Sequence, residues 1–195
     1  IGRTILLDDM VSKHIRSHPG CTIVNIACGM DTRFNRIDNG IIRWYNIDLE
    51  NVVDFRQQYI VDSQREKTLA YSAMDPSWAS EIEAKENVLF IMEGLVMYLS
   101  QEDMKKILDI IDKNFKSATV FVEMMPPYDF DVKSVEETDA KFSWCVEKGD
   151  ELERLNPNFK WIEDRNLFEG VTVYKPITKL ISWIPSFRRK MDYIS

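Results

Sequence analysis

The chain carries at residues 22–33 the sequence Thr-Ile-Val-Asn-Ile-Ala-Cys-Gly-Met-Asp-Thr-Arg, in which an apolar run ends in a turn of small residues. A second run, residues 43–48, ends in Asp48, 19 positions after Gly29. Small residues let the backbone approach a ligand closely, and an acid at the end of the next strand accepts hydrogen bonds from ribose hydroxyls. This layout predicts a site for an adenosine-containing cofactor.

Runs rich in β-branched and aromatic residues recur along the chain and predict strands at 22–27, 43–48, 69–74, 88–92 and 118–125. Helical spacing of apolar residues predicts helices over 5–15 and after Ser100, where Ser100 and Asp103 form a capping-box pattern. Near-continuous apolar strands that alternate with amphipathic helices are typical of a mainly parallel sheet covered on both faces. The predicted fold class is therefore a doubly wound, Rossmann-like α/β domain.

The length of 195 residues favours a single domain over residues 1–195, and the absence of an initiator Met suggests that an N-terminal segment is missing. Residues 127–158 are polar and acidic, which predicts a cap or insertion over the active site. In the tail, two further strands are expected near residues 160–163 and 190–194.

The composition excludes several classes of function. A net charge of -7 argues against a nucleic-acid partner, and no apolar stretch approaches the roughly 18 to 20 residues that cross a membrane. Three cysteines without metal-ligand spacing indicate neither a zinc site nor a disulfide framework. We therefore expect no metal and a cytoplasmic location.

Polar and small residues gather where the predicted strands end, at Ala27 to Gly29, Asp48, Met74-Asp75 and Glu93-Gly94. Ligands in open parallel sheets bind at the carboxyl ends of the strands, so these residues are candidates for one site. Asp31 and Asp48 are also suited to cap the helices that follow them, and Asp75 before Pro76 suits a turn. Glu93 emerges directly from a buried strand and needs a cationic partner, for which a ligand is one choice.

The chain resembles the class I S-adenosylmethionine-dependent methyltransferases of the leucine carboxyl methyltransferase group, in particular its branch similar to the tetracenomycin polyketide O-methyltransferase. The resemblance covers residues 2–121, with a looser tail. It is carried by Arg3-Thr4, by residues 24–33 with their Asp-Thr-Arg ending, by Trp-Tyr-Asn-Ile-Asp-Leu at 44–49, and by Phe-Ile-Met-Glu-Gly-Leu-Val-Met-Tyr-Leu at 90–99. It implies a seven-stranded sheet of the class I methyltransferase type.

The resemblance also implies a role for each matching residue in binding S-adenosyl-L-methionine. Asp48 would hold the ribose hydroxyls, and the methionine moiety would lie against Ala27 and Gly29 with Asp31 nearby. The adenine would lie between Leu49, Ala73 and Met74. Arg3 would pair with the carboxylate of the cofactor, and Glu93 would lie beside its amino group or its sulfonium side, which agrees with the needs of a zwitterionic ligand.

Three residues leave alternatives open. The family usually has Gly where this chain has Ala27, which we expect to be tolerated if φ stays negative. Arg33 would either orient an acidic substrate or form an ion pair with Asp31, and the ion pair is favoured. Tyr98 would either line the acceptor pocket or belong to the core. The two histidines, His14 and His18, are expected to be structural.

The sequence therefore predicts an S-adenosylmethionine-dependent O-methyltransferase that methylates a carboxylate or hydroxyl of a small molecule by positioning it. The alternatives are a non-catalytic ligand-binding protein on the same fold and, less favoured because Ala-x-Gly-x-Asp lacks the GxGxxG spacing, a dinucleotide-dependent oxidoreductase. The expected partner is the small-molecule acceptor, and a homodimer stays open.

Overall fold

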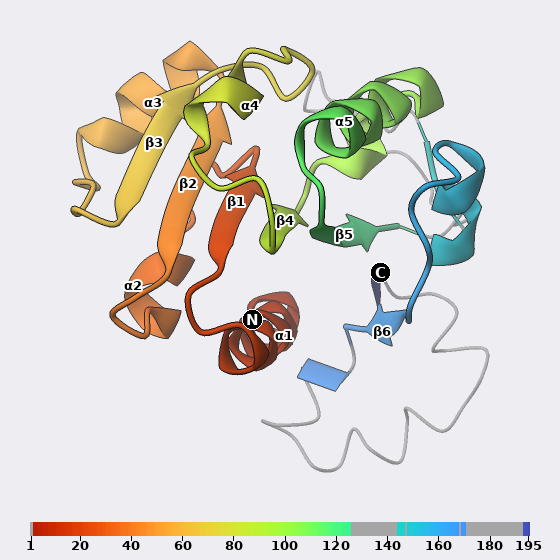
Figure 1. Ribbon diagram of the computed structural model, residues 1–195, viewed down its shortest axis with the longest axis horizontal. Coiled ribbons are helices and arrows are strands. Elements are labelled where there is room, and N and C mark those ends of the chain that lie inside the picture. The colour runs from red at the N-terminus through yellow and green to blue at the C-terminus, as the bar shows by residue number, and fades with distance from the viewer. Residues whose placement is uncertain (1, 126–143, 147, 168, 171–192) are drawn as a thin grey trace, which may run out of the picture. The chain divides into compact units, whose positions relative to one another are not determined.

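A computed structural model describes residues 2–125, 144–146, 148–167, 169–170 and 193–195 of the chain (Figure 1). The chain divides into two compact units. The first, which we call the sheet unit, comprises residues 8–93 and 106–121, and the second, the tail unit, comprises residues 1–7, 94–105 and 122–195. No helix among the described residues is long and apolar enough to span a membrane.

The sheet unit is built on four parallel strands: β1 (Thr22–Ile26), β2 (Arg43–Asp48), β3 (Glu66–Ala70) and β4 (Val88–Met92). Strand β1 lies between β2 and β4, with Asn25 opposite both Asn46 and Ile91 (Figure 1). The chain therefore adds β2 and β3 on one side of β1 and then crosses over to add β4 on the other side. This reversal between β1 and β4 is the switch point of a doubly wound sheet.

The helices of the first half are α1 (Gly2–Ser17), α2 (Arg33–Ile37), α3 (Glu50–Gln57) and α4 (Trp78–Glu81). The second half contains the 3-10 helix η1 (Val96–Tyr98), α5 (Gln101–Asn114), β5 (Ala118–Met124), the 3-10 helix η3 (Gly149–Arg154), β6 (Arg165–Asn166) and β7 (Tyr193–Ile194). The full strand order is β3-β2-β1-β4-β5-β7-β6, and β5 belongs partly to each unit. In the tail unit, β7 pairs antiparallel with β5 and with β6.

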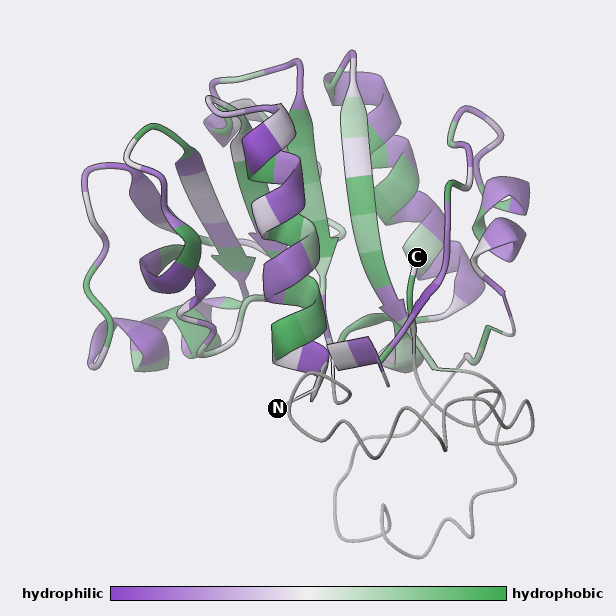
Figure 2. Ribbon diagram, turned by 90° about the horizontal axis from the view of Figure 1, so that it is seen from below, coloured by the Kyte–Doolittle hydropathy of each residue, from purple (hydrophilic) through white to green (hydrophobic). Residues whose placement is uncertain are grey.

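Burial follows the pattern that the sequence predicts. All residues of β1 and β4 are buried, and Figure 2 shows apolar residues concentrated along the strands. The rings of Trp78, Phe90 and Phe115 pack together, with centroids 5.0 to 6.1 Å apart. Buried apolar residues also form the inward stripe of α1 (Leu6, Leu7, Met10, Val11, Ile15) and that of α5 with its next residue (Met104, Ile107, Leu108, Ile111, Phe115).

The capping box predicted before α5 is confirmed. Ser100 Oγ accepts a hydrogen bond from the Asp103 N–H at 3.1 Å, and Asp103 Oδ2 accepts one from the Ser100 N–H at 3.4 Å. These bonds satisfy N–H groups that the first turn of a helix leaves without a partner.

The α/β class and the parallel sheet are thus confirmed, while two strand positions were wrong. The third strand spans Glu66–Ala70 rather than 69–74, because residues 72–75 close a turn in which the Asp75 N–H donates to the Ser72 carbonyl. Residues 160–163 form no strand, and the short β6 begins at Arg165. Since β6 and β7 have two residues each, a sheet of seven full strands stays a prediction, as does the cap at 127–158, most of which lies outside the described residues.

The turn after β1 has an unusual backbone. Ala27 adopts φ 56° and Gly29 φ 49°, so two residues of one turn are left-handed. The condition under which Ala27 was expected to be tolerated, a negative φ, is therefore not met. A left-handed conformation costs an L-residue roughly 1 to 2 kcal/mol, because Cβ approaches a carbonyl oxygen.

We expect Ala27→Gly to stabilise the protein by a few tenths to about 1 kcal/mol. Glycine removes the left-handed strain, and its greater freedom in the unfolded chain takes back about 0.4 to 1 kcal/mol. Urea unfolding measures the difference. The matched change, Gly29→Ala, should destabilise the protein, because alanine is strained at the positive φ of this position. No atom lies within 4 Å of an added Cβ, so backbone strain is the cause tested. Equal stability of both variants would contradict the assignment of strain.

His14 makes stability depend on pH. Burial, and then the charge of the stacked His18 ring at 4.5 Å, lower the pKa of His14 from 6.5 to about 4. As pH falls from about 6.5, the unfolded chain therefore takes up a proton before the folded chain does, so the free energy of unfolding decreases down to about pH 4. Above pH 6.5 this contribution is fully present.

Urea unfolding at a series of pH values should show this decrease, and His14→Phe, which keeps a ring beside Phe121, should flatten it. His18→Phe is the comparison variant: it removes the smaller cause of the lowered His14 pKa, the charge of His18, and should keep most of the decrease, because burial of the half-buried His14 is the larger cause. An identical pH slope in wild type and His14→Phe would rule out His14 as the source.

Candidate functional site

The candidate site lies at the carboxyl edge of the four parallel strands in the sheet unit. Strands β1, β2, β3 and β4 end at Ile26, Asp48, Ala70 and Met92, and their parallel pairing puts these ends on one side of the sheet. The predicted residues Ala27, Gly29, Asp31, Asp48 and Glu93 all follow or form these ends. The structure therefore brings together the part of the site that belongs to this unit.

Asp48 holds the turn that follows β1. Its Oδ2 accepts a hydrogen bond from the Gly29 N–H at 2.8 Å, and its Oδ1 accepts one from the Leu49 N–H at 2.8 Å. A carboxylate has about four acceptor positions, so each oxygen retains one for a further donor such as a hydroxyl. The N-cap of α3 is Leu49, so the alternative of Asp48 as a helix cap was wrong.

Arg33 is the centre of a buried ion-pair network. Its side chain is 1% exposed, and its Nε, Nη1 and Nη2 donate to Asp8 Oδ1 at 2.7 Å, Asp31 Oδ2 at 2.5 Å and Glu93 Oε2 at 2.7 Å. Burial lowers the pKa of the guanidinium, but the charges of Asp31 and Glu93 outweigh burial and raise it. Arg36 adds a second cation, with its Nε 2.8 Å from Asp8 Oδ2.

The network decides between the roles proposed for Arg33. The ion pair with Asp31 is confirmed, and a buried guanidinium with three carboxylate partners is not presented to an acidic substrate. The cation beside Glu93 is Arg33, a partner that the sequence reasoning did not assign. Asp31 also accepts a hydrogen bond from the Arg33 N–H at 2.9 Å, but the N-cap of α2 is Thr32, so the alternative of Asp31 as the helix cap was wrong.

Exposed apolar side chains lie beside these acids. Leu49 directly follows β2 and is 53% exposed, and Met74, in the loop after β3, is 38% exposed. The Ala73 carbonyl accepts a hydrogen bond from Trp78 Nε1 at 3.0 Å, which fixes that loop. Apolar groups of this kind suit a flat ring that covers them.

Cys28 lies inside the turn and faces away from solvent. Its side chain is buried, and burial raises the pKa of its thiol to about 12. The thiol is therefore protonated at neutral pH.

Two predicted residues, Arg3 and Tyr98, belong to the tail unit. Arg3 Nη1 lies 3.3 Å from both carboxylate oxygens of Glu123, and Glu123 Oε2 also accepts a hydrogen bond from the Gly94 N–H at 2.7 Å. Tyr98 lies in η1 and is exposed. Their contribution to a site with the residues of the sheet unit stays a prediction.

Sequence reasoning missed Asp8, Arg56 and Glu123. Arg56 lies on α3 and donates from Nη1 to the carbonyls of Gly29 and Asp31 at 2.9 and 2.7 Å. A signal for Arg56 was available, because it follows the buried Val53 by three positions and so shares the inward face of the helix. Asp8 and Glu123 give no comparable signal, since Asp8 is one of two adjacent acids, with Asp9, and Glu123 is a single acid in an apolar stretch.

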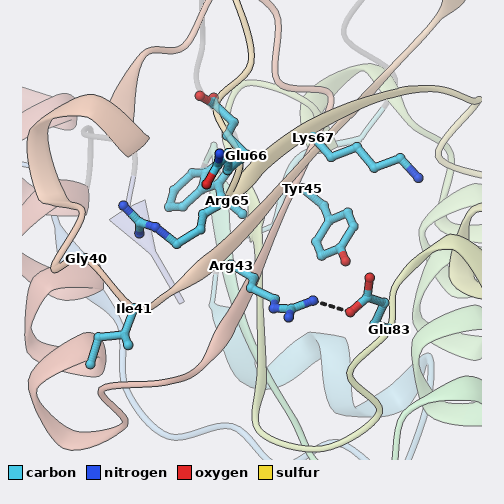
Figure 3. Close-up of a pocket in the computed structure, with 10 residues that line it drawn as sticks. Gly40, Ile41, Arg43, Tyr45, Arg65, Glu66, Lys67 and Glu83 are labelled. Atoms are coloured by element: carbon cyan, nitrogen blue, oxygen red, sulfur yellow. Dashed lines mark hydrogen bonds and ion pairs between the residues drawn. The ribbon is translucent and has the colours of Figure 1, made fainter.

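A separate pocket of about 340 Å³ opens at the other end of β2 and β3 (Figure 3). Its lining includes Arg43, Arg65 and Lys67, near the starts of these strands. Each of these cations has an acidic partner: Glu83, Asp38 and Glu81, respectively. The pocket thus presents charges that are already paired, and it contains none of the predicted site residues.

Comparisons with known proteins agree with this geometry. The family model described as leucine carboxyl methyltransferase matches residues 1–112. The chain is 21% identical to the tetracenomycin polyketide synthesis O-methyltransferase TcmP of Streptomyces glaucescens, covering 96% of this chain and 71% of that protein. It is 28% identical to the S-adenosyl-L-methionine-dependent methyltransferase dpfgK of Gibberella zeae, covering 83% of this chain and 60% of that protein.

Solved structures share the fold. A SAM-dependent methyltransferase from Anabaena variabilis superposes with a TM-score of 0.59 at 12% identity, over 82% of this chain and 74% of its own. Human N-acetylserotonin methyltransferase, solved in complex with SAM, superposes with a TM-score of 0.57 at 10% identity, over 85% of this chain and 48% of its own. From the family match over more than half of its residues, the chain belongs to the leucine carboxyl methyltransferase family.

Proposed function

We propose that the chain binds S-adenosyl-L-methionine and transfers its methyl group to a carboxylate or hydroxyl oxygen of a small molecule. The observation that carries this proposal is the arrangement of Asp48 at the end of β2. Its carboxylate fixes the Gly29 N–H at 2.8 Å and retains acceptor capacity for ribose hydroxyls.

The residues of the sheet unit fit the adenosine half of this cofactor. Leu49, directly after β2, and Met74, next to Ala73 in the loop after β3, both present exposed apolar surface. No atom lies within 4 Å of a Cβ built on Gly29, so the backbone there is open to a close ligand. A ribose on Asp48 and an adenine against Leu49 and Met74 would use both features.

The charge at this edge suits a cationic donor. Four carboxylates, those of Asp8, Asp31, Asp48 and Glu93, lie at this edge. The two guanidinium groups that pair with members of this set, Arg33 and Arg36, neutralise only part of their negative charge. A net negative field favours a sulfonium over the neutral thioether that remains after transfer. The residues thus favour the donor over the demethylated product.

The polar ends of the cofactor need one anion and one cation. Glu93 would accept from its amino group while remaining oriented by Arg33. Arg3, to which the resemblance assigns the carboxylate of the cofactor, donates within the tail unit from Nη1 to both oxygens of Glu123.

When bound, S-adenosylmethionine would supply a methyl group that passes in line from its sulfonium sulfur to the acceptor oxygen, leaving the neutral thioether. The task of the protein is then to align the acceptor and exclude water, and such positioning contributes on the order of 7 to 11 kcal/mol. A carboxylate acceptor needs no base, whereas a hydroxyl benefits from proton removal. His14 contacts His18 and Phe121 rather than the residues at the strand ends, so the proposal names no histidine as a base and favours an acceptor that is already acidic.

Calorimetry distinguishes this function from its alternatives. We expect S-adenosylmethionine and its demethylated product to bind and NAD not to bind. Binding without methyl transfer to any acid or phenol in a substrate panel would favour a non-catalytic protein on the same fold. Failure of both sulfur ligands to bind would refute the methyltransferase proposal.

Asp48→Ala should weaken S-adenosylmethionine binding by about 10- to 100-fold, because hydrogen bonds to a charged group contribute about 1.5 to 3 kcal/mol. The matched control is Asp54→Ala, which removes an exposed carboxylate from α3 and should leave the dissociation constant unchanged. Unchanged affinity in a folded Asp48→Ala variant would mean that Asp48 acts only within the protein.

A further inference from the structure

We infer that Arg56 is a positioning residue that fixes the backbone turn against which the methyl donor binds, an inference that rests on the proposed function. Arg56 lies in the last turn of α3 and is 1% exposed. Its Nη1 donates to two carbonyls, those of Gly29 at 2.9 Å and Asp31 at 2.7 Å. These carbonyls flank Met30, so one nitrogen holds the turn on both sides of its tip.

The turn needs such support because its backbone is strained. Ala27 and Gly29 both have positive φ, and an L-residue leaves that region readily unless the surroundings hold it there. Arg56 holds the carbonyl of Gly29, while Asp48 holds its N–H. The same residue is therefore fixed from α3 and from β2 at once.

Arg56 has a buried counterion. Its Nη2 lies 3.4 Å from Glu66 Oε1, and that oxygen also accepts a hydrogen bond from Asn46 Nδ2 at 2.9 Å. Burial raises the pKa of Glu66, although Asn46 and the charge of Arg56 act against the increase. A buried ion pair is often no more stable than an apolar pair of similar size, so stability alone does not account for this one.

The orientation of the guanidinium points to the turn rather than to the ion pair. The shorter contacts of Arg56 are those to the two carbonyls, and its buried Nε finds no acceptor among the described residues. If the position of the guanidinium were set by the number of its own hydrogen bonds, the buried Nε–H donor would have an acceptor. The two carbonyls thus determine where the guanidinium lies.

A polar connection links the same counterion to the acidic side of the site. Asn46 and Asn25 are opposite each other in the sheet, and Asn25 Nδ2 donates to Asp31 Oδ2 at 3.1 Å. Asp31 therefore has its carbonyl held by Arg56 and its carboxylate held by Asn25 and Arg33. Loss of Arg56 should release the backbone of the turn while Arg33 still holds the carboxylates.

The test compares Arg56→Met and Arg56→Lys with wild type in two measurements on the full chain. Amide hydrogen exchange without ligand should accelerate at Gly29 and Asp31 by at least tenfold in Arg56→Met, and by much less at Phe90 in β4. The dissociation constant for S-adenosylmethionine should rise about 10- to 100-fold in Arg56→Met and less in Arg56→Lys, whose ammonium still reaches a carbonyl. Adding Ala27→Gly should recover part of the affinity, because the turn then needs less support.

Arg43→Met is the matched control, since it removes a guanidinium from the opposite end of β2 and should leave both measurements unchanged. If Arg56→Met does not fold, Arg56→Lys with and without Ala27→Gly decides by the same measurements. Unchanged exchange at Gly29 and Asp31 in a folded variant would overturn the inference. If wild type binds no S-adenosylmethionine, the proposed function fails, and exchange alone still decides whether Arg56 holds the turn.

Discussion

The buried guanidinium of Arg33 is the interaction on which the candidate site depends. A charge removed from water must be compensated at short range, and three carboxylates do so here. They come from the first helix, from the turn after β1 and from the end of β4, which are far apart in the sequence. Because one planar cation contacts all three, its size sets the distances between them, and removal of any one carboxylate would leave a buried N–H donor of Arg33 without its acceptor.

A second guanidinium, Arg56, complements the first by contacting backbone rather than carboxylates. Arg33 therefore fixes acidic side chains, and Arg56 fixes the main chain between them. Asp48 links the two, since it binds the N–H of the residue whose carbonyl Arg56 holds. The result is a preorganised anionic edge whose groups need little rearrangement when a cation approaches.

Much of the fold could be predicted from the sequence, because β1, β2 and β4 are runs rich in β-branched, aromatic and other apolar residues that end in, or are followed by, small or acidic residues. The third strand was misplaced because it pairs with β2 alone, begins with Glu66, Lys67 and Thr68, and so lacks an apolar run. The predicted Asp31, Asp48 and Glu93 do meet at one edge. Asp8, which pairs with Arg33, was missed because a charged residue on a helix normally faces water, and Arg56 was missed although its spacing from Val53 placed it on the inward face of α3.

The buried thiol of Cys28 has a consequence for a protein that handles an alkylating reagent. A thiolate is a strong nucleophile, and one placed in the donor turn would compete with the acceptor for an activated methyl group. Burial keeps the pKa of Cys28 near 12, so at neutral pH nearly every molecule carries the unreactive thiol there. The turn proposed to hold the methyl donor thus keeps the sulfur atom next to Gly29 in the protonated form, which does not compete for an activated methyl group.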